Sequence, residues 1–113
     1  MRQLQPVQLC VLIGLLMLSL AGCAEQEEPS AEHPGLQTYM QYCASCHNAG
    51  VADAPKLGAA DEWEGRIEKG RDVLLQATID GIPPGMPIKG LCMSCSEEQL
   101  LDAIDYMLVA VEG

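Results

Sequence analysis

The stretch Tyr42-Cys43-Ala44-Ser45-Cys46-His47 contains two cysteines separated by two residues, and a histidine directly after the second. Cysteines at this spacing lie about one helical turn apart, so both thiols can add to the vinyl groups of a porphyrin. The adjacent histidine can reach the iron as an axial ligand. The motif therefore predicts one haem c attached at Cys43 and Cys46, with His47 as the proximal ligand.

The chain has a second pair of cysteines, in Cys92-Met93-Ser94-Cys95. Two kinds of site are therefore alternatives to haem attachment. Together the two pairs could form a four-cysteine zinc site. Cys43 and Cys46 could also form a thioredoxin-like dithiol, which belongs in a βαβ context. No stretch of the chain alternates convincingly with period two, and His47 fits a haem motif better than either alternative. We therefore favour haem over zinc and over a dithiol site.

The N-terminus of the 113-residue chain is typical of a secretory signal peptide. Arg2 precedes an apolar run from Val7 to Ala21, which is shorter than the roughly 20 residues that span a bilayer as a helix. Leu20-Ala21-Gly22-Cys23 resembles a bacterial lipobox, which implies cleavage before Cys23 and lipidation of its thiol. Ordinary secretory cleavage nearby is the alternative. We expect a lipoprotein signal peptide over residues 1–22.

Residues 24–34 read AEQEEPSAEHP and have no apolar periodicity. This composition predicts an acidic, solvated tether over residues 23–34, between the lipid anchor and a domain at 35–113. Export also places the remaining cysteines in an oxidising periplasm, where disulfides persist and structural zinc fits poorly.

The chain has a formal net charge of −10, and losing Arg2 with the signal peptide makes it more negative. Such acidity argues against nucleic-acid binding and against electrostatic contact with anionic lipid headgroups. Partners with a positive face are favoured instead. The five basic residues of the domain lie between the haem motif and the segment around residue 86, so we expect salt-dependent association with partners.

Apolar spacing predicts an all-α domain of about four helices. The first expected helix runs through Leu36, Tyr39, Met40 and Cys43, and the second is capped by Asp61 and Glu64 and stops at Gly70. The third covers residues 71–80, stops at Gly81 and has Val73, Leu74, Ala77 and Thr78 on one face. The fourth is capped by Ser96 and Gln99. The domain has no phenylalanine and one tryptophan, so its core is marginal by itself. A large cofactor would fill it.

Met86 is the candidate for a second axial ligand. It lies in Gly81-Ile-Pro-Pro-Gly-Met-Pro-Ile-Lys-Gly90, where three prolines stiffen the chain and hold the thioether in place. Methionine and histidine together raise the reduction potential and fill both axial positions, which favours an electron carrier over a haem enzyme or gas sensor. Open coordination and ligation by His33 are the alternatives. We interpret Met40 and Met107 as core fillers.

The motifs of the domain occur in an order that carries a family resemblance. They are the haem motif, Ala54-Pro55-Lys56-Leu57-Gly58, Trp63-Glu64-Gly65-Arg66, Gly85-Met86-Pro87, Gly90-Leu91-Cys92-Met93-Ser94-Cys95-Ser96 and Asp105-Tyr106-Met107. In this order they resemble a class I c-type cytochrome of the cytochrome c5 family. The resemblance implies a small fold wrapped around one covalent haem. It also implies a periplasmic, non-enzymatic carrier of single electrons between donor and acceptor redox proteins.

The resemblance also assigns roles to residues outside the haem motif. It implies a disulfide between Cys92 and Cys95, in agreement with the expected compartment; a redox-active disulfide is the alternative. It implies that the Pro55 carbonyl accepts a hydrogen bond from His47, the proximal histidine. Trp63 and Arg66 are candidates for packing against the haem and for pairing with its propionates. Core packing and a solvated charge are their alternatives.

Overall fold

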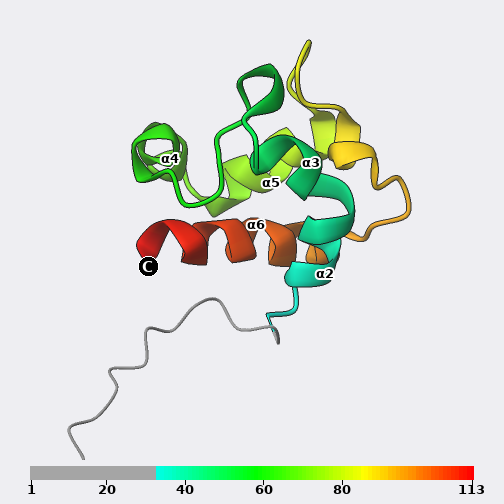
Figure 1. Cartoon of the computed structure of the whole chain (residues 1–113). Helices are drawn as coiled ribbons and strands as arrows, with labels where there is room; N and C mark the ends of the chain where they lie inside the picture. Colours follow the sequence, from blue (N-terminus) through cyan, green and yellow to red (C-terminus); the bar gives the residue numbers. More distant parts are fainter. Residues whose placement is uncertain (1–32) are drawn as a thin grey trace, which may run out of the picture.

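The computed structural model describes residues 33–113. The predicted signal peptide, the predicted lipidation site Cys23 and the predicted tether up to residue 32 lie outside the described residues. Within residues 33–113 the chain is helical and has no strand, apart from an isolated antiparallel bridge between Ile82 and Met86 (Figure 1). The predicted all-α class is confirmed. In this part of the chain no helix is both long and apolar enough to cross a membrane.

The helical elements follow one another in the order of the predicted helices, with short 3₁₀ turns between them. They are α2 (Leu36–Thr38), the π-helical η1 (Tyr39–Cys43), α3 (Ala44–His47), the 3₁₀ turn η2 (Val51–Asp53), α4 (Ala60–Ile67), α5 (Arg71–Asp80), the 3₁₀ turn η3 (Ile88–Leu91) and α6 (Glu97–Glu112). The first three form one helical run that carries the chain into the haem motif. This run confirms the first predicted helix.

The predicted stop of α5 and the predicted cap of α6 are both found in the structure. α5 ends at Asp80, and Gly81 follows with a left-handed φ of 75°, which glycine adopts readily. At the start of α6 the Gln99 N–H donates to Ser96 Oγ (3.2 Å), and the Ser96 N–H donates to Gln99 Oε1 (3.0 Å). This reciprocal pair is the predicted capping box.

The start of α4 differs from the prediction. The helix begins at Ala60, and Ala59 precedes it without a side-chain cap, so Asp61 lies inside the first turn. Glu62 makes the link to the preceding loop instead, because its Oε2 accepts the Lys56 N–H (2.8 Å). The predicted cap at Asp61 is therefore wrong. An acid in the first turn still interacts favourably with the helix dipole.

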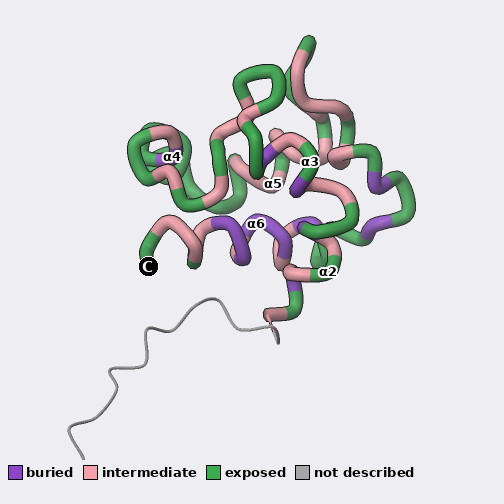
Figure 2. The backbone as a smooth tube through the Cα atoms, viewed as in Figure 1, coloured by how far each residue is buried: buried purple, intermediate pink, exposed green. Residues whose placement is uncertain are grey.

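The N-terminal helical run crosses α6, and the core lies at this crossing. A Cβ atom on Gly35 would overlap the Asp102 carbonyl oxygen, so the two backbones approach as closely as only glycine permits. The rings of Tyr39 and Tyr106 pack with their centroids 4.9 Å apart. Figure 2 shows the buried positions concentrated along α6. The buried core cluster comprises Tyr39, Ala44, Trp63, Ala103, Ile104, Tyr106 and Met107.

Two side chains expected on apolar faces point to solvent. Met107 is buried, as predicted, but Met40 is 59% exposed and is not a core filler. The π-helical geometry of η1 explains this, because it adds a residue to the turn and the 3.6-residue spacing no longer gives the direction of Met40. Val73 lies at the edge of the apolar face of α5 and is also exposed.

Candidate functional site

A cavity of about 370 Å³ lies between the haem motif, α5, α6 and the segment around Met86. This volume falls within the range of roughly 300–1,000 Å³ that is typical of small-molecule pockets. Its walls are largely apolar and come from distant parts of the sequence. They include Trp63, Leu74, Ala77, Ile82, Leu91, Leu100, Ala103, Ile104 and Met107. A wide apolar cavity between helices suits a large planar cofactor.

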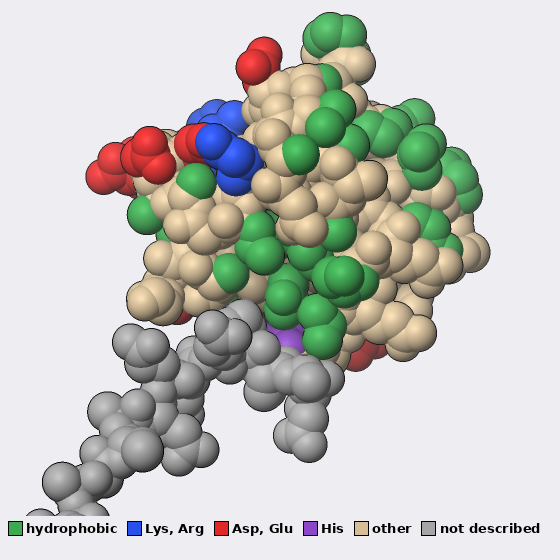
Figure 3. Space-filling model, in the orientation of Figure 1, with side chains coloured by type: hydrophobic (Ala, Val, Ile, Leu, Met, Phe, Trp, Pro, Cys, Tyr) green, Lys and Arg blue, Asp and Glu red, His purple; other side chains and the backbone are tan. Residues whose placement is uncertain are grey.

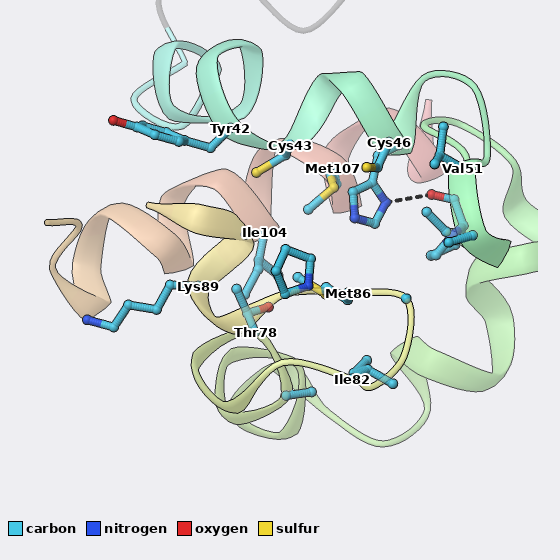
Figure 4. A pocket seen from close by; sticks show the side chains of 18 of the residues that line it. Tyr42, Cys43, Cys46, Val51, Thr78, Ile82, Met86, Lys89, Ile104 and Met107 are labelled. Carbon is cyan, nitrogen blue, oxygen red and sulfur yellow. Dashed lines mark hydrogen bonds between the residues drawn. The ribbon is translucent and has the colours of Figure 1, made fainter. Parts of the chain in front are cut away.

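Cys43 and Cys46 line this cavity as free cysteines, both partly buried. Figure 4 shows their sulfur atoms on one side of the pocket, with Met86 across from them. Burial, together with the nearby Cys46, raises the pKa of the Cys43 thiol to about 11. The Cys43 thiol is therefore neutral at neutral pH, a state that disfavours metal binding as a thiolate.

His47 is buried, and its ring is held by a hydrogen bond. Its Nδ1–H donates to the Pro55 carbonyl oxygen at 2.8 Å, drawn as the dashed line in Figure 4. This bond assigns the ring proton to Nδ1 and leaves the Nε2 lone pair available to bind a metal. The Trp63 ring stacks at 6.1 Å from the His47 ring, and Trp63 Nε1–H donates to the Lys56 carbonyl oxygen (2.8 Å). The imidazole thus has a fixed orientation at the cavity wall.

Met86 lines the cavity from the segment that joins α5 to η3. Ile82 and Met86 exchange two backbone hydrogen bonds, each 2.9 Å long, which close this segment into a tight loop. The position of Met86 is therefore fixed by its own backbone as well as by the surrounding prolines.

His33 lies away from the cavity. Its ring packs edge-on against the Tyr106 ring at 5.5 Å, and its Nδ1 accepts the Gly35 N–H (3.1 Å). His33 is not among the residues that line the cavity. The structure therefore gives no support to the alternative of ligation by His33.

Cys92 and Cys95 form a disulfide, with their Cα atoms 5.4 Å apart. Both cysteines are buried beside Leu100, and Tyr42, Leu75 and Ile79 pack around them. Burial keeps an attacking thiol away from the sulfur atoms, which disfavours the redox-active alternative. Within residues 33–113 no group of three or more His, Cys, Asp or Glu residues could hold a metal ion. Because Cys92 and Cys95 are bonded to each other, they are not available as thiolate ligands, and the structure gives no support to the four-cysteine zinc alternative.

The segment that carries Met86 contacts the turn at η2, where Gly85 lies against the Ala52 carbonyl oxygen. The sequence does not predict this contact. Ala52 and Asp53 have left-handed φ values of 51° and 62°, although neither is a glycine. Both residues line the cavity. The only available signal was the length of the loop after the haem motif, because long loops in small domains often contact a ligand.

The chain matches known proteins over most of the described domain. Residues 30–107 match the family model described as "Cytochrome C oxidase, cbb3-type, subunit III". Cytochrome c5 of Ectopseudomonas mendocina is 42% identical over 69 residues, which are 59% of this chain and 78% of that protein. Cytochrome c5 of Azotobacter vinelandii is 39% identical over 75 residues, 65% of this chain and 89% of that protein.

Two solved structures share the fold. One is a chain from the crystal structure of an electron transfer complex of nitrite reductase with cytochrome c. It has a TM-score of 0.65 and 36% identity, and the match covers 69% of this chain and 94% of that one. The other is the reduced cytochrome c551 of Ectothiorhodospira halophila. It has a TM-score of 0.57 and 33% identity, and the match covers 72% of this chain and 99% of that one.

The helices, the cavity and the C-x-x-C-H motif together define a small c-type cytochrome. The chain belongs to the c-type cytochrome family, as a class I member of the cytochrome c5 type. It binds one haem c covalently and carries single electrons, as its relatives do. The resemblance seen in the sequence is confirmed.

Proposed function

We propose that His47 and Met86 are the two axial iron ligands, that Cys43 and Cys46 carry the thioether bonds, and that the protein is a carrier and not a haem enzyme. One observation carries this proposal: His47, with Nδ1 already bonded to Pro55, and Met86 both line the same apolar cavity. When bound there, haem c supplies one-electron exchange between ferric and ferrous iron.

Each of these residues has a defined task. The Pro55 carbonyl holds the His47 ring and makes Nε2 a stronger ligand, as a hydrogen-bonded second partner does for metal-bound histidines. The Met86 thioether raises the reduction potential. With His47 and Met86 both bound to the iron, oxygen or peroxide would have no open coordination site. These roles suit electron transfer and disfavour the binding of oxygen or peroxide at the iron.

Trp63 and Arg66 have different environments at the cavity. Trp63 is buried against His47 and forms part of the wall, which supports a packing role beside the haem. Arg66 is exposed, lines the cavity and donates from Nη1 to the Glu62 carbonyl oxygen (2.5 Å). We propose that Arg66 pairs with a haem propionate from this position.

The mouth of the cavity is apolar and exposed, which suits a partner surface. Val51, Ile82 and Leu91 line the cavity and are each at least half exposed to solvent. A relative in a complex with nitrite reductase supports a redox enzyme as the partner. We propose that this protein docks its redox partners at the mouth, where the electron has the shortest path.

Charge pairing within the domain lowers the expected salt dependence of docking. In the part of the chain that the structure describes, Lys56 pairs with Glu62 and Arg71 pairs with Asp105. Figure 3 shows Lys and Arg side chains gathered close to acidic side chains. With these two pairs formed, and with Arg66 proposed to pair with a haem propionate, Lys69 and Lys89 are left to steer a partner. We expect the electron-transfer rate to fall modestly as ionic strength rises.

We also propose that the protein is anchored in the periplasm through a lipidated Cys23. The disulfide between Cys92 and Cys95 supports an oxidising compartment. Replacing Cys23 with Ala should move the protein from the membrane fraction to the soluble fraction, without changing its visible spectrum. A Cys23→Ala protein that stays with the membrane would overturn the lipid anchor.

Visible spectroscopy tests the axial ligands. The ferric protein should show the weak long-wavelength band of a methionine-to-iron bond, and the ferrous protein should bind carbon monoxide poorly. Met86→Ala should lose the band, lower the reduction potential and bind carbon monoxide readily. Met107→Ala is the control, because Met107 also lines the cavity; it should keep the band. Rapid carbon monoxide binding by the unchanged protein would contradict ligation by Met86.

A further inference from the structure

The Met86 segment meets the turn after the haem motif at a close backbone contact. A Cβ atom placed on Gly85 would lie 2.8 Å from the Ala52 carbonyl oxygen. Cβ atoms essentially never lie this close to a carbonyl oxygen, so one of the two segments would have to move to accept the side chain. Gly85 and Ala52 both line the cavity, so a movement at this contact changes the cavity itself.

The turn is held firmly on its side of the contact. Gly50 N–H donates to the Cys46 carbonyl oxygen (2.8 Å), so the turn is attached to the haem motif. Ala54 N–H donates to the Val51 carbonyl oxygen (3.0 Å) and closes the turn. Ala52 has a left-handed φ of 51°, a conformation that costs free energy for a residue with a Cβ and persists only where the surroundings impose it. The Ala52 carbonyl therefore has a defined position.

Gly85 and Met86 belong to one small rigid unit on the other side. Ile82 exchanges two backbone hydrogen bonds with Met86, and the Ile82 carbonyl oxygen also accepts the Gly85 N–H (3.1 Å). A displacement of Gly85 is therefore carried to Met86.

We propose that Gly85 is a positioning residue for Met86: its close approach to the Ala52 carbonyl sets how far the Met86 sulfur enters the cavity. This inference rests on the proposed ligation by Met86. A side chain at Gly85 would push the Met86 segment away from the turn and weaken the bond from Met86 to the iron.

The test is Gly85→Ala in the full chain with haem attached. The φ of Gly85 is not left-handed, so alanine adds the contact without a backbone penalty. Overpacking of this size shifts an equilibrium by roughly tenfold or more. We therefore expect a weakened or lost long-wavelength band, a lower reduction potential and roughly tenfold tighter apparent carbon monoxide binding, because apparent affinity follows the fraction of molecules with an open site.

The matched control is Gly65→Ala. Gly65 lies in α4, and a Cβ atom there would meet nothing within 4 Å. It should leave the band, the potential and carbon monoxide binding unchanged. A second variant, Ala52→Gly combined with Gly85→Ala, lets the turn move away from residue 85, because glycine has a wider range of backbone conformations than alanine. The double variant should recover part of the band.

The outcomes separate the two proposals. If the unchanged protein has the band and Gly85→Ala keeps the band, potential and weak carbon monoxide binding, the positioning role is wrong and ligation by Met86 stands. If the unchanged protein lacks the band, the proposed ligation itself fails. If Gly85→Ala gives little protein, the double variant decides: recovery of yield and band supports the inference, and a yield as low as that of Gly85→Ala overturns it.

Discussion

His47 and Pro55 are joined by a hydrogen bond of 2.8 Å from the ring Nδ1–H to the backbone carbonyl oxygen. The bond spans the loop that follows the haem motif and connects the proposed proximal ligand to a residue of rigid φ. A donor bond of this kind increases electron density on the ring and favours ferric iron. With His47 as the proposed proximal ligand, the loop after the motif would belong to the electronic environment of the iron.

We predict that Pro55→Ala raises the reduction potential slightly and leaves the long-wavelength band in place. Alanine keeps the carbonyl but loosens the loop, so the hydrogen bond to His47 weakens while Met86 is untouched. Spectroelectrochemistry measures the potential. The control is Pro34→Ala, at an exposed residue outside the cavity. A potential equal to that of the unchanged protein would show that Pro55 does not tune His47.

We predict that Gly35→Ala destabilises the fold by about 1–3 kcal/mol or more, as overpacking does. The new methyl group would overlap the Asp102 carbonyl oxygen and separate the N-terminal helical run from α6. Chemical denaturation followed by circular dichroism measures the free energy of unfolding. Gly65→Ala, in an exposed turn of α4, should instead stabilise the protein by about 0.5–1 kcal/mol. Equal effects of the two substitutions would contradict the close crossing.

We predict that Tyr39 makes the fold sensitive to alkaline pH. Burial raises the pKa of Tyr39 to about 12, with the nearby Tyr106 adding to the shift. The unfolded chain has the ordinary tyrosine pKa of about 10. The stability contribution is therefore complete below about pH 10 and is lost as the pH rises through about 12.

Tyr39→Phe tests this pH dependence. Tyr39 O–H donates to Asn48 Oδ1, so Tyr39→Phe should lower stability at neutral pH by about 1 kcal/mol. The same substitution should flatten the decline in stability above about pH 10, because the buried phenol no longer titrates. Tyr42→Phe, at a partly exposed tyrosine, is the control. An alkaline decline that is identical in Tyr39→Phe and the unchanged protein would exclude Tyr39 as its source.

We predict that replacing both Cys92 and Cys95 with Ala lowers stability by about 2 kcal/mol and leaves the axial ligands in place. A loop this short contributes about that much by restricting the unfolded chain. The disulfide packs beside Tyr42 and Leu100, and no cysteine of the pair lines the cavity. Denaturation and the ferric spectrum are the two measurements. Loss of the long-wavelength band in the double variant would show that the disulfide holds Met86.

Sequence periodicity located the helices wherever local rules decide the outcome. The stop at Gly81 and the capping box of Ser96 depend on a few neighbouring residues, and both were predicted correctly. The N-cap of α4 was predicted two residues too late, at Asp61 and not at Ala59, because Glu62, and not Asp61, bonds back to the loop. Met40 was misplaced because periodicity assumes an α-helix, whereas η1 is a π-helix.

The sequence predicts which residues bind the haem, but not the backbone contacts that hold these residues in position. The haem motif and Met86 are recognisable because few residue types can perform their tasks. The contact between Gly85 and Ala52 joins distant segments through backbone atoms, and side-chain identity carries no signal for it. The left-handed φ of Ala52 is likewise imposed by tertiary structure, since alanine does not favour it.

Proton NMR of the ferrous protein tests the proposed ligation by Met86 most directly. A methionine bound to the iron lies over the porphyrin ring, so the ring current moves its methyl resonance far upfield. We predict one such methionine methyl resonance in the unchanged protein, and its loss in Met86→Ala but not in Met107→Ala. A ferrous spectrum without an upfield methionine methyl, or one that survives Met86→Ala, would contradict the account.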